Sequence, residues 1–365
     1  MCGIAGFSSY EEDYGICRGK WEEILETMNQ VQKRRGPDED GIFLDAHCGM
    51  AHVRLCILDL KRGQQPMSRH SQGRTCTICF NGEIYNMKAL RKELEAEGAI
   101  FQSDSDTEVF LVGYMLHGEN FVKRINGVFG AALWDSDKET LFLFRDRAGV
   151  KPLFYTKYRE TLVYASELKG ILAYPGMEAV ADADTLCEIF ALGPAKTYGK
   201  GVLKDIYEVL PGHYLVFHKG KIRDICYWKL ESHVQEASFE ETVEKTSWLI
   251  EDAVKLQMLS DVPVSTFLSG GVDSSLVTAI CAKELKKQGK TLRTFSFDFE
   301  GNRKYFKANR FQPSQDRPWV EKMVKFCQSE HTFLECDNIQ LLDYLYKAVD
   351  ARDLPCMADV ESSML

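Results

Sequence analysis

The sequence predicts two regions of different fold class, an α+β region followed by an α/β region with a parallel sheet. Three observations lead to this prediction. The first two hundred residues alternate between strand-like and helical patterns, residues 231–240 form a polar linker, and residues 264–298 read as strand, glycine turn, helix and strand. A length of 365 residues agrees with two domains or two and a part, since one domain usually takes about 100–200 residues.

The first region is expected to be rich in strands. Apolar residues at helical spacing from Trp21 to Val31 predict a helix, and two more helices are expected at 87–97 and 107–117. Residues 50–59 alternate between apolar and polar side chains, which predicts a half-buried strand. Further strands are expected at residues 74–80, 140–144, 162–166 and 213–218.

The second region begins with a long helix from Phe239. Residues 264–268, 273–287 and 292–298 then predict a βαβ unit, which forms parallel sheets and binds ligands at the carboxyl ends of its strands. Residues 302–318 are polar and partly basic, and they are expected to form a surface loop.

Charge and hydropathy exclude some classes of protein. Lys and Arg number 45 against 54 Asp and Glu, a net charge of −9, so no general nucleic-acid-binding surface is expected. The least charged long window, residues 262–282, is broken by a Ser-Gly-Gly turn and by Asp273, so no membrane span is expected. The start of the chain lacks the pattern of a secretory signal.

The twelve cysteines are scattered, and most are expected to be reduced, buried thiols of a cytoplasmic protein. Cys76 and Cys79 are spaced like a metal pair, but in a strand residues three apart point to opposite faces. A zinc site is therefore not expected.

Cys2 is a candidate nucleophile. A small residue after the initiator favours removal of Met1, which leaves a cysteine with a thiol and a free α-amine. An α-amine has a reference pKa near 7.7–8.0, so it can accept the proton of the thiol at working pH.

Four motifs accompany Cys2: C-G-I-A-G at 2–6, R-R-G-P-D at 34–38, N-G-E-I-Y-N at 81–86 and S-D-T-E at 105–108. Together they resemble the class II glutamine amidotransferases, which are N-terminal-nucleophile hydrolases with an αββα sandwich. The resemblance spans roughly residues 2–230 and implies a glutaminase domain at 1–230, followed by a second domain at 231–365.

Under this resemblance Cys2 attacks the side-chain amide of L-glutamine, while the Asn81 side chain and the Gly82 N–H stabilise the oxyanion. Arg54 is suited to the glutamine carboxylate, and Glu83 and Asp106 match the positions that take the amino end. The implied glutamine-binding residues are Arg54, Leu55, Cys56, Ile57, Leu58, Asn81, Gly82, Glu83 and Asp106. Taken singly, Arg54 also reads as a solvated strand charge, Asn81-Gly82 as a hairpin turn and Asp106 as a helix cap.

S-G-G-V-D-S-S at 269–275 lies where a strand is expected to pass into a helix, a setting in which backbone N–H groups surround phosphate oxygens. A glycine turn with an Asp cap is the simpler reading of the string alone. In context it resembles the pyrophosphate loop of adenylating enzymes, with Asp273 as a ligand of the Mg²⁺ that accompanies ATP. The implied ATP-binding residues are Leu268, Ser269, Gly270, Gly271, Asp273, Ser274, Ser275 and Phe297.

A glutaminase followed by this loop resembles glutamine-dependent asparagine synthetases. Their reaction implies L-glutamine, L-aspartate and ATP as substrates, with a cysteinyl thioester and a β-aspartyl-adenylate as intermediates. It would give asparagine, glutamate, AMP and pyrophosphate, and the resemblance allows a homodimer. Three further matching motifs, at 129–134, 145–153 and 164–169, are interpreted as scaffold and ammonia-path elements.

The sequence also departs from that family. The S-G-E-G-x-D-E segment is absent, although residues 353–364 still match a family segment and a helix is expected to begin near Asp359. We therefore expect a fragment or a truncated product that hydrolyses glutamine without forming asparagine. Alternatives are an amidotransferase for a different carboxylate acceptor, and a glutaminase-only or regulatory glutamine-binding fragment.

Overall fold

The computed structural model describes residues 1–71, 73–193, 195–310 and 312–355. The chain divides into two compact units, Met1–Ser232 and His233–Leu365.

The first unit contains two antiparallel six-stranded sheets. In the first sheet the strand order is β10-β8-β9-β1-β3-β2. Its strands are β1 (Gly3–Ser9), β2 (Glu39–Leu44), β3 (Cys48–Arg54), β8 (Phe154–Tyr158), β9 (Thr161–Ala165) and β10 (Tyr207–Glu208). In the second sheet the order is β12-β11-β7-β6-β5-β4. Its strands are β4 (Met67–Ser71), β5 (Arg74–Ile84), β6 (Gly127–Asp135), β7 (Thr140–Arg145), β11 (His213–His218) and β12 (Lys221–Cys226).

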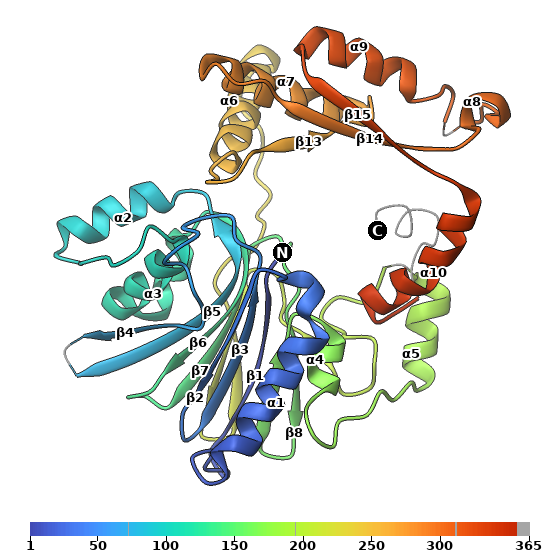
Figure 1. Cartoon of the computed structure of the whole chain (residues 1–365). Helices are drawn as coiled ribbons and strands as arrows, with labels where there is room; N and C mark the ends of the chain where they lie inside the picture. The colour runs from blue at the N-terminus through green and yellow to red at the C-terminus, as the bar shows by residue number, and fades with distance from the viewer. Residues whose placement is uncertain (72, 194, 311, 356–365) are drawn as a thin grey trace. The chain divides into compact units, whose positions relative to one another are not determined.

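Helices cover the outer faces of both sheets (Figure 1). Helices α1 (Arg18–Val31) and α4 (Leu168–Leu172) pack on the first sheet, and α3 (Asp106–His117) packs on the second, with α2 (Met87–Ala96) beside it. Apolar side chains of both sheets meet between them. This shared core includes Ile4, Met50, Cys79, Trp134, Leu143 and Tyr164. The αββα order expected from the resemblance is thereby confirmed.

One local expectation was wrong, and the hairpin reading of Asn81-Gly82 is excluded. The strand predicted over residues 50–59 ends at Arg54, because the Arg54 guanidinium binds the carbonyl oxygens of Leu58 and Asp59 and turns the chain into a loop. Asn81-Gly82 is no hairpin turn: both residues lie inside β5, where Asn81 pairs with Gly130 of β6.

The second unit contains a parallel sheet of β13 (Ser265–Phe267), β14 (Arg293–Phe299) and β15 (Glu330–Cys336), in that order. Helix α7 (Val272–Lys287) joins β13 to β14, so the predicted βαβ unit is confirmed. The other helices are α6 (Phe239–Gln257), α8 (Asn302–Tyr305), α9 (Arg317–Cys327) and α10 (Asn338–Arg352). Part of the loop expected at 302–318 is thus helical, and the helix expected near Asp359 lies outside the described residues.

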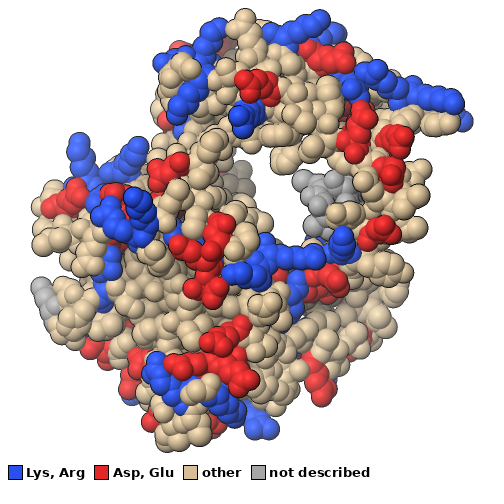
Figure 2. Space-filling view, in the orientation of Figure 1, with Lys and Arg blue, Asp and Glu red and all other residues tan. Residues whose placement is uncertain are grey.

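Charged side chains of both signs are interspersed on the face shown in Figure 2. No helix among the described residues is both long and apolar enough to span a membrane.

Candidate active site

Cys2 lies directly before β1, whose first residue, Gly3, pairs with Val53 of β3. The backbone N–H of Leu55 lies 3.5 Å from the Cys2 sulfur, and the Leu55 carbonyl oxygen lies 3.7 Å from it. The Cys2 carbonyl oxygen accepts a hydrogen bond from Arg35 Nε at 2.8 Å, and Arg35 forms an ion pair with Glu167. The candidate nucleophile is therefore held on both sides of its Cα atom.

Burial raises the pKa of the Cys2 thiol, while the Leu55 N–H and the nearby terminal amine act in the opposite direction. In this chain the terminal amine belongs to Met1. Burial lowers the pKa of this amine, the charge of Cys2 opposes the shift, and the cations Arg35 and Lys151 add to it. A lower pKa favours the neutral amine, which is the form that can accept a proton.

Cys2 opens into a pocket of about 110 Å³. Most of the residues that the sequence assigned to glutamine binding line it together: Arg54, Leu55, Ile57, Leu58, Asn81, Gly82, Glu83 and Asp106. Cys56 is the exception among them, since it is absent from the pocket lining and its backbone N–H donates to Asp38 Oδ2 at 2.8 Å.

Asn81 carries an unused hydrogen-bond donor at this pocket. Its side chain is buried, and its Nδ2 atom has no hydrogen-bond partner among the described residues. Buried polar groups are nearly always paired, so an unpaired one calls for an explanation. Beside it, a Cβ atom at Gly82 would lie 2.3 Å from the Val128 carbonyl oxygen, so only glycine permits this approach of β6 to β5.

Two carboxyl groups occupy the same pocket. Burial and the neighbouring Asp106 raise the pKa of Glu83 to about 8. Burial raises the pKa of Asp106 to about 6, although the Ile84 N–H donates to its Oδ2 at 2.9 Å. A ligand ammonium group would relieve this crowding of acids, because an opposite charge favours the ionised carboxylate.

Arg54 is buried and already has protein partners. Its guanidinium pairs with Glu39 at 2.7 Å and donates to the carbonyl oxygens of Leu58 at 2.9 Å and Asp59 at 2.8 Å. Gly63 allows this arrangement, since a Cβ atom there would lie 2.2 Å from Arg54 Nη2. In this structure Arg54 therefore shapes the loop that follows β3.

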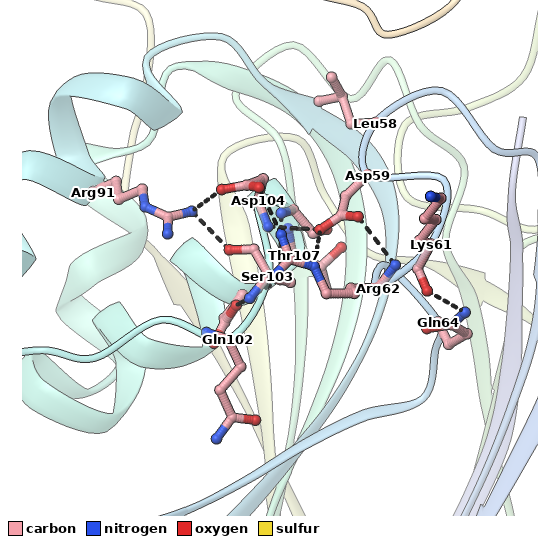
Figure 3. A network of polar contacts seen from close by, with 12 residues as sticks. Leu58, Asp59, Lys61, Arg62, Gln64, Arg91, Gln102, Ser103, Asp104 and Thr107 are labelled. Atoms are coloured by element: carbon pink, nitrogen blue, oxygen red, sulfur yellow. Dashed lines mark hydrogen bonds and ion pairs between the residues drawn. The ribbon is translucent and has the colours of Figure 1, made fainter.

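A second set of contacts fastens this loop to the segment before α3 (Figure 3). Asp59 accepts hydrogen bonds from the backbone N–H groups of Asp104 at 2.6 Å and Arg62 at 3.0 Å. Arg62 also pairs with Asp104 at 2.7 Å, and Arg91 pairs with Asp104 at 3.2 Å. These contacts connect the loop that carries Leu58 to the segment that leads into Asp106, and both residues line the Cys2 pocket.

Gln65 and Lys151 are among the pocket-lining residues that sequence reasoning missed. Gln65 accepts a hydrogen bond from the Phe80 N–H at 2.6 Å and donates to Thr107 Oγ1 at 3.2 Å, so it ties β5 to α3. No sequence pattern marks Gln65. Lys151 lies within the 145–153 motif, where a lone lysine amid glycine and proline was an available signal.

The glycine turn of the second unit lies between β13 and α7. Gly270 has a φ of +82°, and a Cβ atom there would lie 2.8 Å from Trp319 Cβ, so this position requires glycine. Ser269 and Ser274 contact each other through their hydroxyls at 3.0 Å, and the helix begins at Val272 after Gly271 as N-cap. Free N–H groups at the start of a 16-residue helix favour an anion.

A pocket of about 450 Å³ adjoins this turn. It is lined by Leu268, Ser269 and Phe297 of the predicted ATP set, together with Asp298, Asn302 and Arg317. Asp273 is exposed in the first turn of α7, and its side chain has no ion pair or hydrogen bond within the part of the chain that the structure describes. One free carboxylate beside a glycine turn at a helix N-terminus fits the usual coordination of Mg²⁺ when nucleotide phosphates are bound.

The sandwich fold, a cysteine at position 2 and an unpaired amide in the same pocket agree with a glutamine amidotransferase domain. The glutamine amidotransferase domain family matches residues 1–228, and the asparagine synthase family matches residues 245–365. The chain belongs to the glutamine amidotransferases, in the branch of the glutamine-hydrolysing asparagine synthetases.

Three curated relatives illustrate this membership. Glutamine-hydrolysing asparagine synthetase 3 of Bacillus subtilis is 44% identical over 366 residues, covering 100% of this chain and 59% of the relative. Glutamine-hydrolysing asparagine synthetase 1 of the same organism is 37% identical, covering 82% of this chain and 46% of the relative. Amidase chyE of Penicillium rubens is 35% identical, covering 84% of this chain and 46% of the relative. The chain thus spans about half the length of these relatives.

Proposed function

We propose that this chain hydrolyses L-glutamine at Cys2 and that it serves glutamine-dependent asparagine synthesis. Ammonia from the first unit would attack a β-aspartyl-adenylate formed from L-aspartate and ATP. The observation that carries the glutaminase part is the buried, unpaired Asn81 Nδ2 in the pocket that contains Cys2.

The proposed chemistry follows from these positions. After removal of Met1, the α-amine of Cys2 takes the thiol proton, and the sulfur attacks the side-chain carbonyl of glutamine. Asn81 Nδ2 and the Gly82 N–H donate to the oxyanion. Donors that are held in place before the reaction stabilise the negative charge that develops in the transition state. The protonated amine then gives its proton to the leaving ammonia, and water cleaves the resulting thioester to glutamate.

The carboxyl groups of Glu83 and Asp106 are proposed to bind the α-ammonium group of glutamine. Arg54 is proposed to take its carboxylate, and its ion pair with Glu39 would have to open or be shared. Leu55, Ile57 and Leu58 would enclose the aliphatic part of the substrate.

In the second unit we propose that Ser269, Gly270, Gly271, Ser274 and Ser275 bind the pyrophosphate of ATP. Leu268 and Phe297 would enclose the adenosine, and Asp273 would ligate Mg²⁺. Mg²⁺ supplies positive charge to the phosphates when it is bound. The support is the glycine-dependent turn at Gly270 and the adjoining pocket.

The glutaminase proposal is tested by glutamate release from L-glutamine with the purified chain, after mass spectrometry has shown that Met1 is absent. Cys2→Ala is expected to abolish release, and an added amino-terminal residue is expected to do the same. Glutamate release by Cys2→Ala at the wild-type rate would refute the assignment. Exposed Cys17 supplies a matched control, since Cys17→Ala should retain full activity.

The acceptor is tested separately. ATP–pyrophosphate exchange in the presence of L-aspartate or other carboxylic acids would identify the acid that is adenylated. The chyE relative is named an amidase, so a different acceptor is the second candidate. Exchange that depends on another acid and not on aspartate would favour that alternative.

A further inference from the structure

Lys151 is a half-buried cation in the glutamine pocket to which nothing above assigns a role. It lies between β7 and β8 and lines the pocket together with Cys2 and Glu83. Within the described ranges its ammonium group makes neither a hydrogen bond nor an ion pair. A lysine ammonium is usually solvated or paired, so its placement here without a partner needs a reason.

The backbone of Lys151 is fixed by two buried charged residues. Asp146 is fully buried and accepts hydrogen bonds from four backbone N–H groups, among them those of Val150 at 3.1 Å and Lys151 at 3.0 Å. Arg145 donates to the carbonyl oxygens of Lys151 at 3.0 Å and Gly149 at 2.8 Å. This framework holds the lysine in the pocket without involving the end of its side chain.

Lys151 is one of several charged groups that face Cys2. The groups that line its pocket, or that act on Cys2 or on the terminal amine beside it, are Met1 (amine), Arg35, Asp38, Arg54, Glu83, Asp106 and Lys151. Arg35 and Arg54 form ion pairs with Glu167 and Glu39 respectively. Lys151 is therefore the side-chain cation of this set whose charge no described carboxylate neutralises by direct contact.

Its electrostatic surroundings agree with a link to Cys2. Burial lowers the pKa of Lys151, Arg35 lowers it further, and Glu83 and Cys2 oppose the shift. Lys151 in turn contributes to the lowered pKa of the Met1 amine, the terminal amine of the unprocessed chain. A positive charge favours a nearby thiolate, and after removal of Met1 it would also disfavour the ammonium form of the Cys2 α-amine, so both effects would activate the same nucleophile.

We propose that Lys151 is a positioning residue for the nucleophile: its ammonium group supplies a fixed positive charge that favours the thiolate of Cys2 and the neutral form of the adjacent α-amine. This inference deepens the proposed glutaminase function and rests on it for its biological meaning. Its physical content, the reactivity of one thiol, can be measured without glutamine.

The experiment measures the rate of Cys2 alkylation by iodoacetamide between pH 5 and 10, by peptide mass spectrometry on the full chain lacking Met1. Exposed Cys17 and Cys226 serve as internal references. Lys151→Met removes the charge while keeping much of the length, and Lys151→Arg keeps the charge. Lys157→Met is the matched control, because Lys157 lies on β8 and pairs with Glu160 at the surface.

Lys151→Met is expected to slow Cys2 alkylation at pH 7 about three- to tenfold and to move its pH profile to higher pH. Cys17 and Cys226 should keep their rates, and Lys151→Arg should restore most of the Cys2 rate. An unchanged Cys2 profile in Lys151→Met would overturn the proposal. So would a shift that Lys151→Arg fails to restore, since it would indicate a loss of packing instead of charge.

Failure of the proposed function has a different signature. If the wild-type chain released no glutamate while Lys151→Met still shifted the alkylation profile, the glutaminase assignment would fail and the role of Lys151 would stand. The opposite outcome is normal glutamate release by the wild-type chain, together with a Lys151→Met variant in which only KM changes and the alkylation profile of Cys2 stays the same. In that case the glutaminase assignment would stand and the role of Lys151 would be refuted.

Discussion

The two units of the chain bury their residues very differently. In the first unit every residue of β1 and of β3 is buried, and α3 buries nine of its twelve residues. In the second unit α6 buries none of its nineteen residues, and Val320 is the buried residue of α9. Both units carry a candidate site, but these sites rest on different kinds of support.

This difference teaches what holds each site in shape. The pocket at Cys2 is built from groups such as Asp146 and Arg54, which are buried and hydrogen-bonded to several backbone positions. The turn at Gly270 depends on an exposed pair of serine hydroxyls and on the close approach of Trp319 in α9. Substitutions should therefore affect stability and activity together in the first unit, and mainly ligand binding in the second.

The largest effect is expected at the unpaired amide. Asn81→Asp keeps the size of the side chain and removes its N–H donor, so the kcat for glutamine hydrolysis should fall about 100- to 1000-fold. Glutamate release and a thermal melt measured together would separate chemistry from folding. A decrease below fivefold, with folding intact, would remove Asn81 from the oxyanion site.

The same substitution in each unit compares them directly. Asp146→Asn places an amide N–H against backbone donors in a buried site, so the free energy of unfolding should fall by about 2–3 kcal/mol. Asp273→Asn is on the surface and should change stability by less than about 0.5 kcal/mol while weakening Mg-ATP binding about tenfold. Denaturant titration and calorimetric ATP titration measure the two quantities. Equal destabilisation by both variants would contradict the contrast between the units.

A pair of neighbouring glycines gives a sharper test within the second unit. Gly270→Ala must adopt a positive φ and meet Trp319, so it should cost about 1–2 kcal/mol and disturb the turn. At Gly271 the added Cβ would lie 3.5 Å from Ser269 Oγ, which is an ordinary contact, so Gly271→Ala should be milder. Fluorescence titration with ATP should rank wild type, Gly271→Ala and Gly270→Ala in order of decreasing affinity.

The smallest effect is expected in the way that the stability of the first unit depends on pH. Burial raises the pKa of Glu83 from 4.5 to about 8, so between these values the folded chain retains a proton that the unfolded chain releases. The contribution of Glu83 to the free energy of unfolding is therefore lost as the pH rises from 4.5 to 8. Burial lowers the pKa of His52 to about 4. The contribution of His52 to the free energy of unfolding is therefore lost as the pH falls below 6.5, which is the opposite pH dependence.

The difference between wild type and Glu83→Gln isolates this group. Raising the pH from 7 to 8 should lower the melting temperature of wild type by about 2–4 °C more than that of Glu83→Gln, which corresponds to about 1 kcal/mol. L-glutamine at pH 8 should reduce the gap, since its ammonium group favours the ionised carboxylate. Parallel pH curves for the two proteins would contradict the raised pKa.

The sequence predicted the parts of the fold that depend on periodicity or on a motif. The helical repeat from Trp21 to Val31 and the βαβ unit around Gly270 are both present in the structure. The strand at residues 50–59 was extended too far, because alternation cannot reveal that Arg54 turns back to bind carbonyl oxygens. Gln65 was missed for the same reason, since its position depends on Phe80 and Thr107, which are distant in the chain. Lys151 lies in a motif that the sequence analysis had singled out, but its place in the pocket was not inferred from it.

The pairing of β1 with β9 has a consequence for biosynthesis. Ala5 lies opposite Ala165, so the first strand cannot complete its sheet until more than 160 residues have been synthesised. At about 5–20 residues per second, this leaves Met1 accessible to an aminopeptidase on the ribosome for about 8–30 s. Once the sheet closes, Met1 lies in the wall of the pocket. Met1 remains 57% exposed there, so removal of Met1 can begin during synthesis but does not depend on it. An amino-terminal purification tag would block maturation of the proposed nucleophile.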